Sequence, residues 1–276
     1  MNHVTASPLG KASASVEHYD ATLLFPIARA EQRRALGING TLPFTGVDIW
    51  NAYELSWLDG RGKPQVAIGE FRVPATSPNI IESKSLKLYL NSYNQTRIES
   101  AEAFHDRVAV DLSHAAGTPV SVVLTRSEDF AHFANGELEG ESIDGVLIDV
   151  DAYGPPDAGY LRADANAKPI SETLVSNLLK SNCPVTGQPD WASIQIAYTG
   201  AAIDHESLLR YLVSFRRHDD FHEQCVERIF ADISEQCAPM KLSVYARYTR
   251  RGGLDINPWR SSVDAEPPSN HRGARQ

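Results

Sequence analysis

Residues 54–73 read ELSWLDGRGKPQVAIGEFRV, a stretch with the pattern of two strands joined by a tight turn. The segments on either side of the turn, 54–58 and 65–73, are rich in the apolar and aromatic residues that strands favour. Residues 59–62 contain two glycines, which is typical of a short hairpin loop. We therefore predict a hairpin here, and antiparallel pairing as the basis of the fold.

The elements predicted after this hairpin recur in the second half of the chain. Apolar residues at helical spacing predict helices in pairs, at residues 85–93 and 102–112 and at residues 206–215 and 223–233. Further strands are predicted at residues 120–125, 145–149, 192–199 and 242–248. Two strands, two helices and two strands, repeated less completely, predict antiparallel sheets with paired helices on one face, in the α+β class.

Proline and glycine residues between the two halves indicate a linker around residues 151–170. The predicted modules are accordingly residues 21–160 and 161–262. Residues 1–20, rich in Ser, Ala and Gly, and the tail 263–276 are expected to be flexible ends. No Gly-x-Gly-x-x-Gly sequence follows a predicted strand and precedes a helix, so a Rossmann domain is not supported.

The composition is that of a globular protein. The chain has 276 residues, of which 42% are hydrophobic, and this is enough for packed cores. Its net charge of −9 disfavours a nucleic-acid partner, because such binding depends on Lys and Arg residues that neutralise phosphates. The longest apolar runs are far shorter than the roughly 20 residues of a membrane helix, so we expect no membrane span.

The expected compartment is the cytoplasm. Residues 21–30 are apolar, but Glu17 and Asp20 precede them where a secretory signal carries positive charge, so no targeting peptide is predicted. The cysteines are odd in number and widely spaced, which fits free thiols in a reducing compartment and argues against disulfides. They are Cys183, Cys225 and Cys237.

Cys183 is the candidate nucleophile. It follows Asn182 and precedes Pro184, and these residues favour a tight bend that presents the thiol in a constrained conformation. The alternative is a buried cysteine that acts as a small hydrophobic residue. Asp190 lies seven positions later and offers a carboxyl group for proton transfer, although its surroundings also read as a turn followed by a strand.

Two basic clusters are candidate phosphate sites. Lys84 and Lys87 share one side of a helix that starts near Glu82, so they either bind a phosphate or are solvated while Glu82 complements the helix dipole. Arg251 precedes Gly252 in the sequence RRGG, where glycine lets the backbone approach a phosphate closely. The alternative for the second cluster is a charged strand end followed by a turn.

The sequence HEQC at residues 222–225 has the His and Cys spacing of a zinc site, but the zincin pattern requires a His at position 226, which is Val. No other His or Cys pair completes a tetrahedral set, so no metal site is predicted. We interpret His222 and Glu223 as a proton-transfer group and a hydrogen-bond acceptor, or as ordinary residues of a helix start.

Several stretches together closely resemble the 7-cyano-7-deazaguanine reductase family, the nitrile reductases of queuosine biosynthesis, in its long two-module form. They are residues 82–89, 182–191, 221–230 and 245–260. The family signature Glu-(Ser/Leu)-Lys-(Ser/Ala)-hydrophobic-Lys-(Leu/Tyr)-aromatic is met at every position by ESKSLKLY, residues 82–89. The resemblance covers most of residues 43–261 and is weakest at 127–170.

The resemblance implies tandem tunnelling-fold (T-fold) modules assembled as a homodimer, with the signature in the first module and the nucleophile in the second. It implies that the nitrile of a small deazapurine is reduced to an aminomethyl group with two NADPH per turnover and no metal. Cys183 would form a thioimidate with the nitrile, Asp190 would protonate the nitrile nitrogen, and His222 would supply protons in the later steps. The implied substrate contacts are Ile81, Glu82, Ser83, His222 and Glu223, and the implied NADPH contacts are Ser83, Lys84, Arg251 and Gly252.

Two other classes of protein compete with this interpretation. A cyclohydrolase-type pterin or purine hydrolase would share the fold, but it should need a metal, and the sequence offers no ligand set. A catalytically silent binding or scaffold protein on the same fold would hold the deazapurine without oxidising NADPH.

Overall fold

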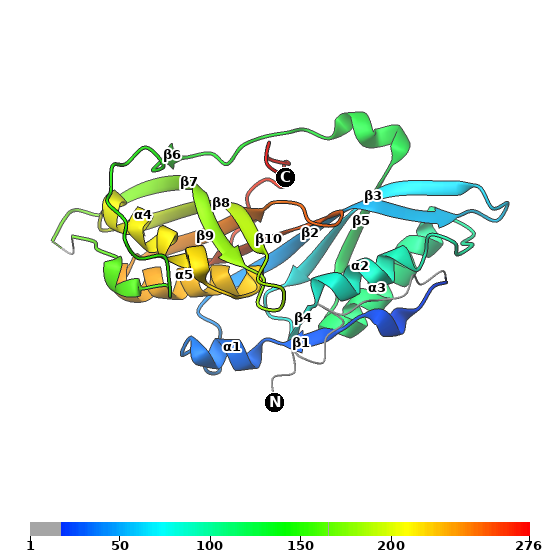
Figure 1. The fold of residues 1–276 in the computed structure, drawn as a ribbon, viewed down its shortest axis with the longest axis horizontal. Coiled ribbons are helices and arrows are strands. Elements are labelled where there is room, and N and C mark those ends of the chain that lie inside the picture. Colours follow the sequence, from blue (N-terminus) through cyan, green and yellow to red (C-terminus); the bar gives the residue numbers. More distant parts are fainter. Residues whose placement is uncertain (1–17, 165) are drawn as a thin grey trace. The chain divides into compact units, whose positions relative to one another are not determined.

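The computed structural model of the protein describes residues 18–164 and 166–276. The described helices are α1 (Ala30–Ala35), α2 (Ser83–Asn91), α3 (Ala101–Ala116), α4 (His205–Ser214) and α5 (His222–Cys237). The described strands are β1 (Pro26–Ala28), β2 (Thr45–Leu58), β3 (Pro64–Pro74), β4 (Asn79–Ile81), β5 (Ser121–Arg126), β6 (Glu141–Ser142), β7 (Ile170–Asn182), β8 (Pro189–Gly200), β9 (Lys241–Tyr248) and β10 (Leu254–Ser261) (Figure 1). Of the N-terminal end that is predicted to be flexible, residues 1–17 lie outside the described residues.

The chain divides into two compact units, and both are discontinuous in sequence. The first unit contains the chain up to residue 32 together with residues 48–134 and 250–256. The second unit contains residues 33–47, 135–249 and 257–276. The predicted modules, by contrast, are continuous stretches of sequence. Their boundaries stay a prediction.

The strands of the first unit are hydrogen-bonded in the order β5-β3-β2-β10. The hairpin predicted at residues 54–73 is confirmed as β2 and β3, and both strands extend further than expected. Asp59 closes the turn, because its Oδ1 accepts hydrogen bonds from the backbone N–H groups of Arg61 (2.9 Å) and Lys63 (3.0 Å). Strand β5 pairs antiparallel with β3, with Phe71 opposite Val122.

Helices α2 and α3 bury their apolar sides against the strands of the first unit (Figure 1). Helix α3 begins after Ser100, whose side chain accepts a hydrogen bond from the N–H of Ala103, and ends at Gly117, which adopts a φ of 74°. Phe104 of this helix stacks on Trp57 of β2, with ring centroids 4.5 Å apart. Since burial of each such side chain is worth roughly 1.5–3 kcal/mol, these contacts hold the helix pair on the sheet.

The strands of the second unit are hydrogen-bonded in the order β10-β9-β8-β7-β6. Strands β7 and β8 form a long antiparallel hairpin, whose register runs from Ile170 opposite Gly200 to Asn182 opposite Pro189. Helix α4 contacts β7 and helix α5 contacts β9 (Figure 1). The α+β class with antiparallel strands and helices is confirmed, and the exception is the short parallel pair of β6 with β7.

One predicted strand is wrong, and two long strands escaped the prediction. Residues 145–149 form no strand and Leu147 is 93% exposed, because the pairing of β6 with β7 ends at Ser142 and leaves these residues without a partner. Strand β7 lies just after the expected linker and carries many polar residues. In strand β10 apolar and polar residues alternate only over residues 254–257 before Pro258 breaks the pattern, although the strand is buried at every position.

The C-terminal residues 263–276 make hydrogen bonds within the second unit. The Gln276 side chain donates to the carbonyl oxygen of Tyr248 (3.2 Å) and to Oδ1 of Asn257 (2.8 Å). Arg275 donates to the carbonyl oxygen of Asn177 (2.7 Å). These contacts tie the chain end to strands β7, β9 and β10, and the flexibility of the tail stays a prediction about its motion.

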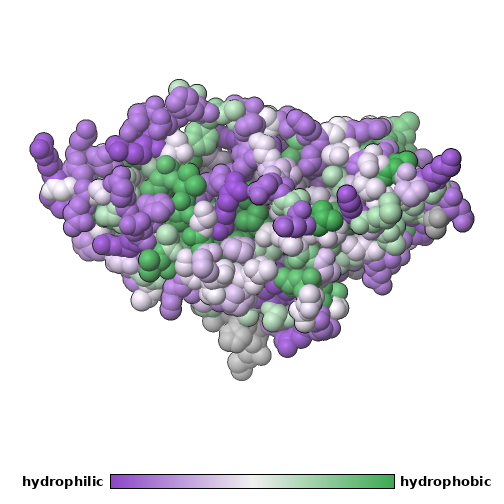
Figure 2. All heavy atoms as spheres, turned by 180° about the vertical axis from the view of Figure 1, so that it is seen from behind, coloured by the Kyte–Doolittle hydropathy of each residue, from purple (hydrophilic) through white to green (hydrophobic). Residues whose placement is uncertain are grey.

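Hydrophilic side chains cover most of the face drawn in Figure 2, and apolar side chains appear there in small groups. Across residues 18–164 and 166–276, the exposed large apolar residues are spread over different elements, which is normal for a globular protein. In the same described part of the chain, none of the helices combines the length and the apolar character needed to cross a bilayer.

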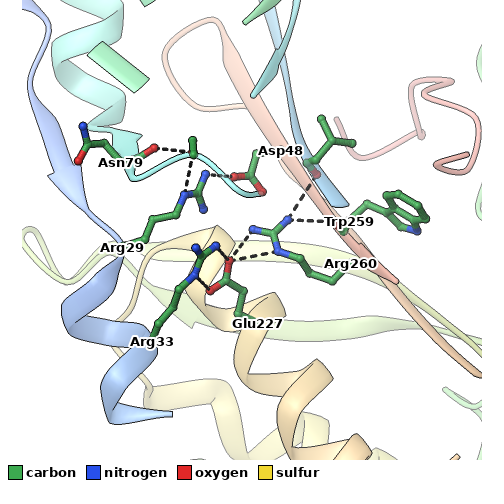
Figure 3. Close-up of polar contacts among 9 residues, drawn as sticks. Arg29, Arg33, Asp48, Asn79, Glu227, Trp259 and Arg260 are labelled. Carbon is green, nitrogen blue, oxygen red and sulfur yellow. Dashed lines mark hydrogen bonds and ion pairs between the residues drawn. The ribbon is translucent and has the colours of Figure 1, made fainter. Parts of the chain in front are cut away.

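Buried ion pairs fasten helix α5 within the second unit (Figure 3). Glu227 of this helix is 2% exposed and accepts hydrogen bonds from Arg33 (2.9 and 2.7 Å) and from Arg260 of β10 (3.2 and 2.9 Å). Both guanidinium groups also lie over the ring of Phe44, which meets Phe230 of α5 edge-on. One carboxylate therefore joins the helix to two other segments of the unit.

Replacing Glu227 with alanine should lower the free energy of unfolding by about 3–5 kcal/mol, because buried guanidinium groups lose this carboxylate. The matched control is Glu128→Ala, which removes an exposed pair with Arg126 (3.1 Å) and should cost less than about 1 kcal/mol. Equilibrium unfolding in urea measures both losses. Equal losses in the two variants would contradict the account of Glu227 as the residue that fastens α5.

Candidate active site

The β7–β8 hairpin determines where Cys183 and Asp190 lie. Its register sets Ser181 opposite Asp190, and the chain turns through residues 183–188. The backbone N–H of Cys183 donates to the carbonyl oxygen of Gln188 (2.9 Å), and its carbonyl oxygen accepts from the N–H of Gly187 (2.9 Å). The thiol is thus carried by a hydrogen-bonded turn, as the sequence predicts.

Asn182 ties this hairpin to the segment that leads into α5. Its backbone N–H donates to the carbonyl oxygen of His218 (2.8 Å), and its own carbonyl oxygen accepts from the N–H of Asp220 (3.1 Å). Its side-chain amide donates to Asp219 (3.0 Å). Helix α5 begins two residues after Asp220. The first residues of the helix are therefore fixed relative to the turn that carries Cys183.

His222, the first residue of α5, lies against Asp190 and Tyr248. Its Nε2 is 3.3 Å from Oδ2 of Asp190. Its ring stacks on the ring of Tyr248, with centroids 3.9 Å apart and an angle of 23° between the planes. Asp190 is 4% exposed and Tyr248 is fully buried, so this group is largely shielded from water. The structure brings together two of the three residues that are predicted to be catalytic.

Glu223 follows His222 in the first turn of α5 and is 2% exposed. The dipole of the helix favours a carboxylate at this end. Burial of a carboxylate costs free energy unless hydrogen-bonding partners compensate it, and a solvated residue at a helix start does not have this cost. The geometry is compatible with either role that the sequence suggests for Glu223.

The three cysteines differ in accessibility. Cys183 is partly exposed, whereas Cys225 is 0% and Cys237 is 6% exposed. Burial raises the pKa of the Cys225 thiol well above its usual range, and it raises the pKa of the Cys237 thiol to about 11. Because the thiolate is the reactive form, we expect these two cysteines to react far more slowly than an accessible thiol at neutral pH. The exposure of Cys183 argues against its being a simple core residue.

The other predicted substrate residues lie at the start of α2, in the first unit. Glu82 is 0% exposed and caps the helix, since its Oε1 accepts from the N–H of Lys84 and its Oε2 from the N–H of Ser85, both at 2.8 Å. Burial raises the pKa of Glu82, and the two capping hydrogen bonds oppose that rise. Ile81 ends β4 and Ser83 begins α2. The helix-start role of Glu82 is confirmed, and its contact with a substrate stays a prediction.

Gly252 and Gly253 form the turn that follows Arg251, and both adopt positive φ angles, 59° and 79°. A Cβ atom on Gly252 would lie 2.6 Å from Nζ of Lys87, and one on Gly253 would lie 2.4 Å from Cδ of Glu54. Only glycine fits this turn. Bare backbone beside an ammonium group is suited to phosphate, so the residues present fit a phosphorylated cofactor.

Some of the predicted residues meet, and one side chain of the site, Tyr248, escaped the sequence reasoning. Cys183 and Asp190 share one hairpin, and Asp190 meets His222. The sequence offers Lys87, with Lys84, as a candidate phosphate site, and its position beside Gly252 depends on the tertiary structure. Nothing in the sequence signals the stacking of Tyr248, because it depends on how a strand and a helix pack. Among the residues described by the structure, no group of three or more potential ligands could hold a metal ion.

Comparison with known families gives two matches. The family model described as "Nitrile reductase, 7-cyano-7-deazaguanine-reductase N-term" matches residues 15–124, and the model described as "QueF-like protein" matches residues 189–267. The matched residues include ESKSLKLY in the first half and Asp190 and His222 in the second half. The class of protein is therefore an oxidoreductase, a nitrile reductase.

Full-length relatives give the family. A protein of Paraburkholderia phytofirmans named NADPH-dependent 7-cyano-7-deazaguanine reductase is 59% identical over 270 residues, which cover 98% of each chain. A protein of Ralstonia nicotianae with the same name is 58% identical over 278 residues, which cover 100% of each chain. The chain belongs to the NADPH-dependent 7-cyano-7-deazaguanine reductase family. The solved structure of an archaeosine synthase, QueF-Like, matches 37% of this chain at 14% identity with a TM-score of 0.32, too low to support an argument.

In the native protein, an alkylating reagent such as iodoacetamide should modify Cys183 at neutral pH and leave Cys225 and Cys237 unmodified. Cys183 is partly exposed, while burial keeps the other two thiols protonated and out of reach. Peptide mass mapping before and after unfolding in denaturant measures the modification, and Cys183→Ser is the control. Modification of Cys225 or Cys237 at the rate of Cys183 in the folded protein would contradict this ranking.

Proposed function

We propose that this chain reduces the nitrile of 7-cyano-7-deazaguanine to the aminomethyl group of 7-aminomethyl-7-deazaguanine, with NADPH as reductant and a covalent thioimidate on Cys183 as intermediate, in queuosine biosynthesis. One observation supports the chemistry above all others. A partly exposed thiol sits on the same hairpin as a buried carboxyl group, and that carboxyl group meets an imidazole at 3.3 Å. These are the nucleophile and the proton-transfer groups that addition to a nitrile requires.

The first step is covalent. The thiolate of Cys183 uses an electron pair on its sulfur to form a bond to the nitrile carbon, and one π bond of the nitrile becomes a lone pair on nitrogen. Asp190 supplies the proton that this nitrogen takes up, so the product is a neutral thioimidate. A nitrile carbon is a weak electrophile, and the thioimidate carbon accepts hydride far more readily, which is the advantage of the covalent route.

The later steps need two hydrides and two protons. The thioimidate carbon accepts a hydride while its nitrogen accepts a proton, which gives a thiohemiaminal. The carbon–sulfur bond then breaks, the thiol is released and an imine remains. The imine carbon accepts the second hydride and the nitrogen a second proton, which completes the amine. We propose His222 as the proton source for these steps, because its imidazole is placed beside Asp190.

Buried carboxylates are the proposed contacts to the deazapurine. A carboxylate can accept two parallel hydrogen bonds from the ring N–H and the exocyclic amine of a guanine-like edge. We assign this role to Glu223 and to Glu82, which are 2% and 0% exposed. Oε2 of Glu82 accepts one capping hydrogen bond, from Ser85, whereas Oε1 accepts from the N–H of Lys84 and from the hydroxyl of Ser83 (3.5 Å), so a base would share Oε1 or replace the Ser83 contact. Ile81, Ser83 and His222 complete the proposed set.

NADPH would supply the hydrides, and residues of the first unit are proposed to hold it. Gly252 and Arg251 belong to the glycine turn beside the ammonium group of Lys87. Ser83 and Lys84 begin α2, where the positive end of the helix dipole favours anions. These residues bind and orient the cofactor phosphates, and we assign them no part in proton transfer.

The form of the substrate, the cellular compartment and the assembly of the enzyme are also proposed. The net charge of −9 disfavours direct contact with nucleic acid, so the enzyme would act on the free base. The free cysteines fit a reducing compartment, the cytoplasm. The resemblance to the two-module reductases supports tandem T-fold modules, a homodimer and a requirement for two NADPH per turnover without a metal.

The proposal is tested by the intact mass of the protein mixed with 7-cyano-7-deazaguanine in the absence of NADPH. A one-to-one adduct should form, disappear when NADPH is added and be absent from Cys183→Ala, because the sulfur of Cys183 carries the intermediate. Cys237→Ala is the matched control and should form the adduct normally, whereas Asp190→Ala should form it slowly. Full turnover in Cys183→Ala, or no adduct on the reduced wild-type protein, would refute the covalent scheme.

A further inference from the structure

The imidazole of His222 is held from two directions within the second unit. Its edge meets a carboxylate, with Nε2 3.3 Å from Oδ2 of Asp190. Its face meets an aromatic ring, with the centroid of Tyr248 3.9 Å away and the planes 23° apart. A contact at the edge limits rotation within the plane of the ring, and a contact at the face limits tilting of that plane. Together they leave the imidazole one orientation.

Both of these contacts come from one pair of strands. Tyr248 is the last residue of β9 and lies opposite Ala192 of β8, two residues after Asp190. The pairing continues beyond Tyr248, because the N–H of Thr249 donates to the carbonyl oxygen of Trp191 (2.8 Å). The spacing between the phenol ring and the carboxyl group is therefore set by the sheet. His222 of α5 contacts both groups, so its imidazole takes its position from β8 and β9.

Tyr248 is suited to be a platform and unsuited to move protons. It is fully buried, and its hydroxyl lies against the side chains of Cys225 and Ser181. Burial raises the pKa of Tyr248 well above its usual range, so its hydroxyl stays protonated under all ordinary conditions. What Tyr248 offers His222 is the face of its ring, which packs against a neutral imidazole and attracts a charged one.

The stacked arrangement leaves the other nitrogen of His222 available. Its Nδ1 is buried from solvent and has no hydrogen-bond partner among residues 18–164 and 166–276. A buried nitrogen without a partner is costly, and such a group commonly marks a position where a ligand or a water binds. The direction in which Nδ1 points depends on the plane of the ring, which Tyr248 holds, and on the contact of Nε2 with Asp190 within that plane.

We propose that Tyr248 is a positioning residue for His222, whose ring face holds the imidazole in the orientation needed to deliver protons during the two reductions. This inference rests on the function proposed above and adds to it a residue outside the family signature and outside the set of expected contacts. Tyr248 touches neither substrate nor cofactor in this scheme. It acts through His222 alone.

The proposal separates two measurable steps. Formation of the thioimidate uses Cys183 and Asp190, whereas the reductions use His222. Loss of the Tyr248 ring should therefore slow the reductions by about 10- to 100-fold, the range expected when a proton-transfer group is misplaced, and leave the rate of adduct formation within about threefold. Loss of a merely structural residue would affect both rates together.

The experiment compares variants in both assays. Tyr248→Leu and Tyr248→Met remove the ring, and Met adapts its shape to the gap if Leu does not fold. Tyr248→Phe keeps the ring and should restore the reduction rate to near that of the wild type. Tyr245→Leu is the matched control, a buried tyrosine three residues before Tyr248 in the same strand and therefore on the opposite face of the sheet. Adduct formation is followed by intact mass without NADPH, reduction by NADPH oxidation, and folding by the melting temperature.

The expected result is a selective loss of reduction in the two ring-free variants, with rescue in Tyr248→Phe and an unchanged ratio of the two rates in Tyr245→Leu. A parallel loss of both rates, no loss of either, or a Tyr248→Phe variant as slow as Tyr248→Leu would overturn the proposal. Failure of both ring-free variants to fold would also overturn it, because the role would then be one of core packing. If the wild type forms no adduct, the proposed function itself fails, and this is a different outcome.

Discussion

The register of the β7–β8 hairpin is the constraint on which the candidate site depends. Ser181 lies opposite Asp190, and both are buried. Because successive side chains of a strand point to opposite faces, a slip of one residue would turn Asp190 away from His222. The backbone hydrogen bonds between Cys183 and residues 187–188 close the hairpin at the same register. One pairing pattern therefore sets both the turn that carries the thiol and the strand position that carries the carboxyl group.

The candidate site also depends on the position of helix α5, which is held at two places, just before its first residue and at Glu227. Asn182 binds the residues just before the helix, which ties its start to the hairpin. Five residues after His222, Glu227 is held by Arg33 and Arg260. A buried carboxylate with two guanidinium partners has few alternative positions, since any displacement leaves a charge without compensation. The helix can neither slide nor rotate without breaking one of these contacts.

The sequence predicts those parts of the fold that depend on local patterns. The β2–β3 hairpin follows from its glycine-containing turn, and the four long helices follow from apolar residues at helical spacing. The prediction fails where tertiary context decides. Strand β10 is buried at all of its positions, but its alternation of apolar and polar residues is limited to 254–257 and ends at Pro258. Residues 145–149 have a strand-like pattern, but within residues 18–164 and 166–276 no strand pairs with them.

The same distinction holds for the candidate site. Cys183 and Asp190 can be found from the sequence, because a proline-bounded turn is a local signal that the structure reproduces. The place of Glu82 at the start of a helix is also local and is correctly anticipated, whereas the two hydrogen bonds by which it caps the helix are not part of the prediction. The stack of Tyr248 on His222 joins residues 26 positions apart in different elements, so no spacing rule could reveal it. Lys87 is predictable only in part. The sequence indicates the side of the helix on which Lys87 lies, but it does not indicate that its ammonium group lies close to Gly252.

The central claim is that this chain carries out a four-electron reduction of a nitrile through its own thiol. The measurement that tests it most directly is the stoichiometry of turnover, obtained by following NADPH absorbance and identifying the product by mass when 7-cyano-7-deazaguanine is limiting. The account predicts two NADPH oxidised for each nitrile consumed, with the aminomethyl base as the only product. Binding or hydrolysis of the deazapurine without oxidation of NADPH would contradict it.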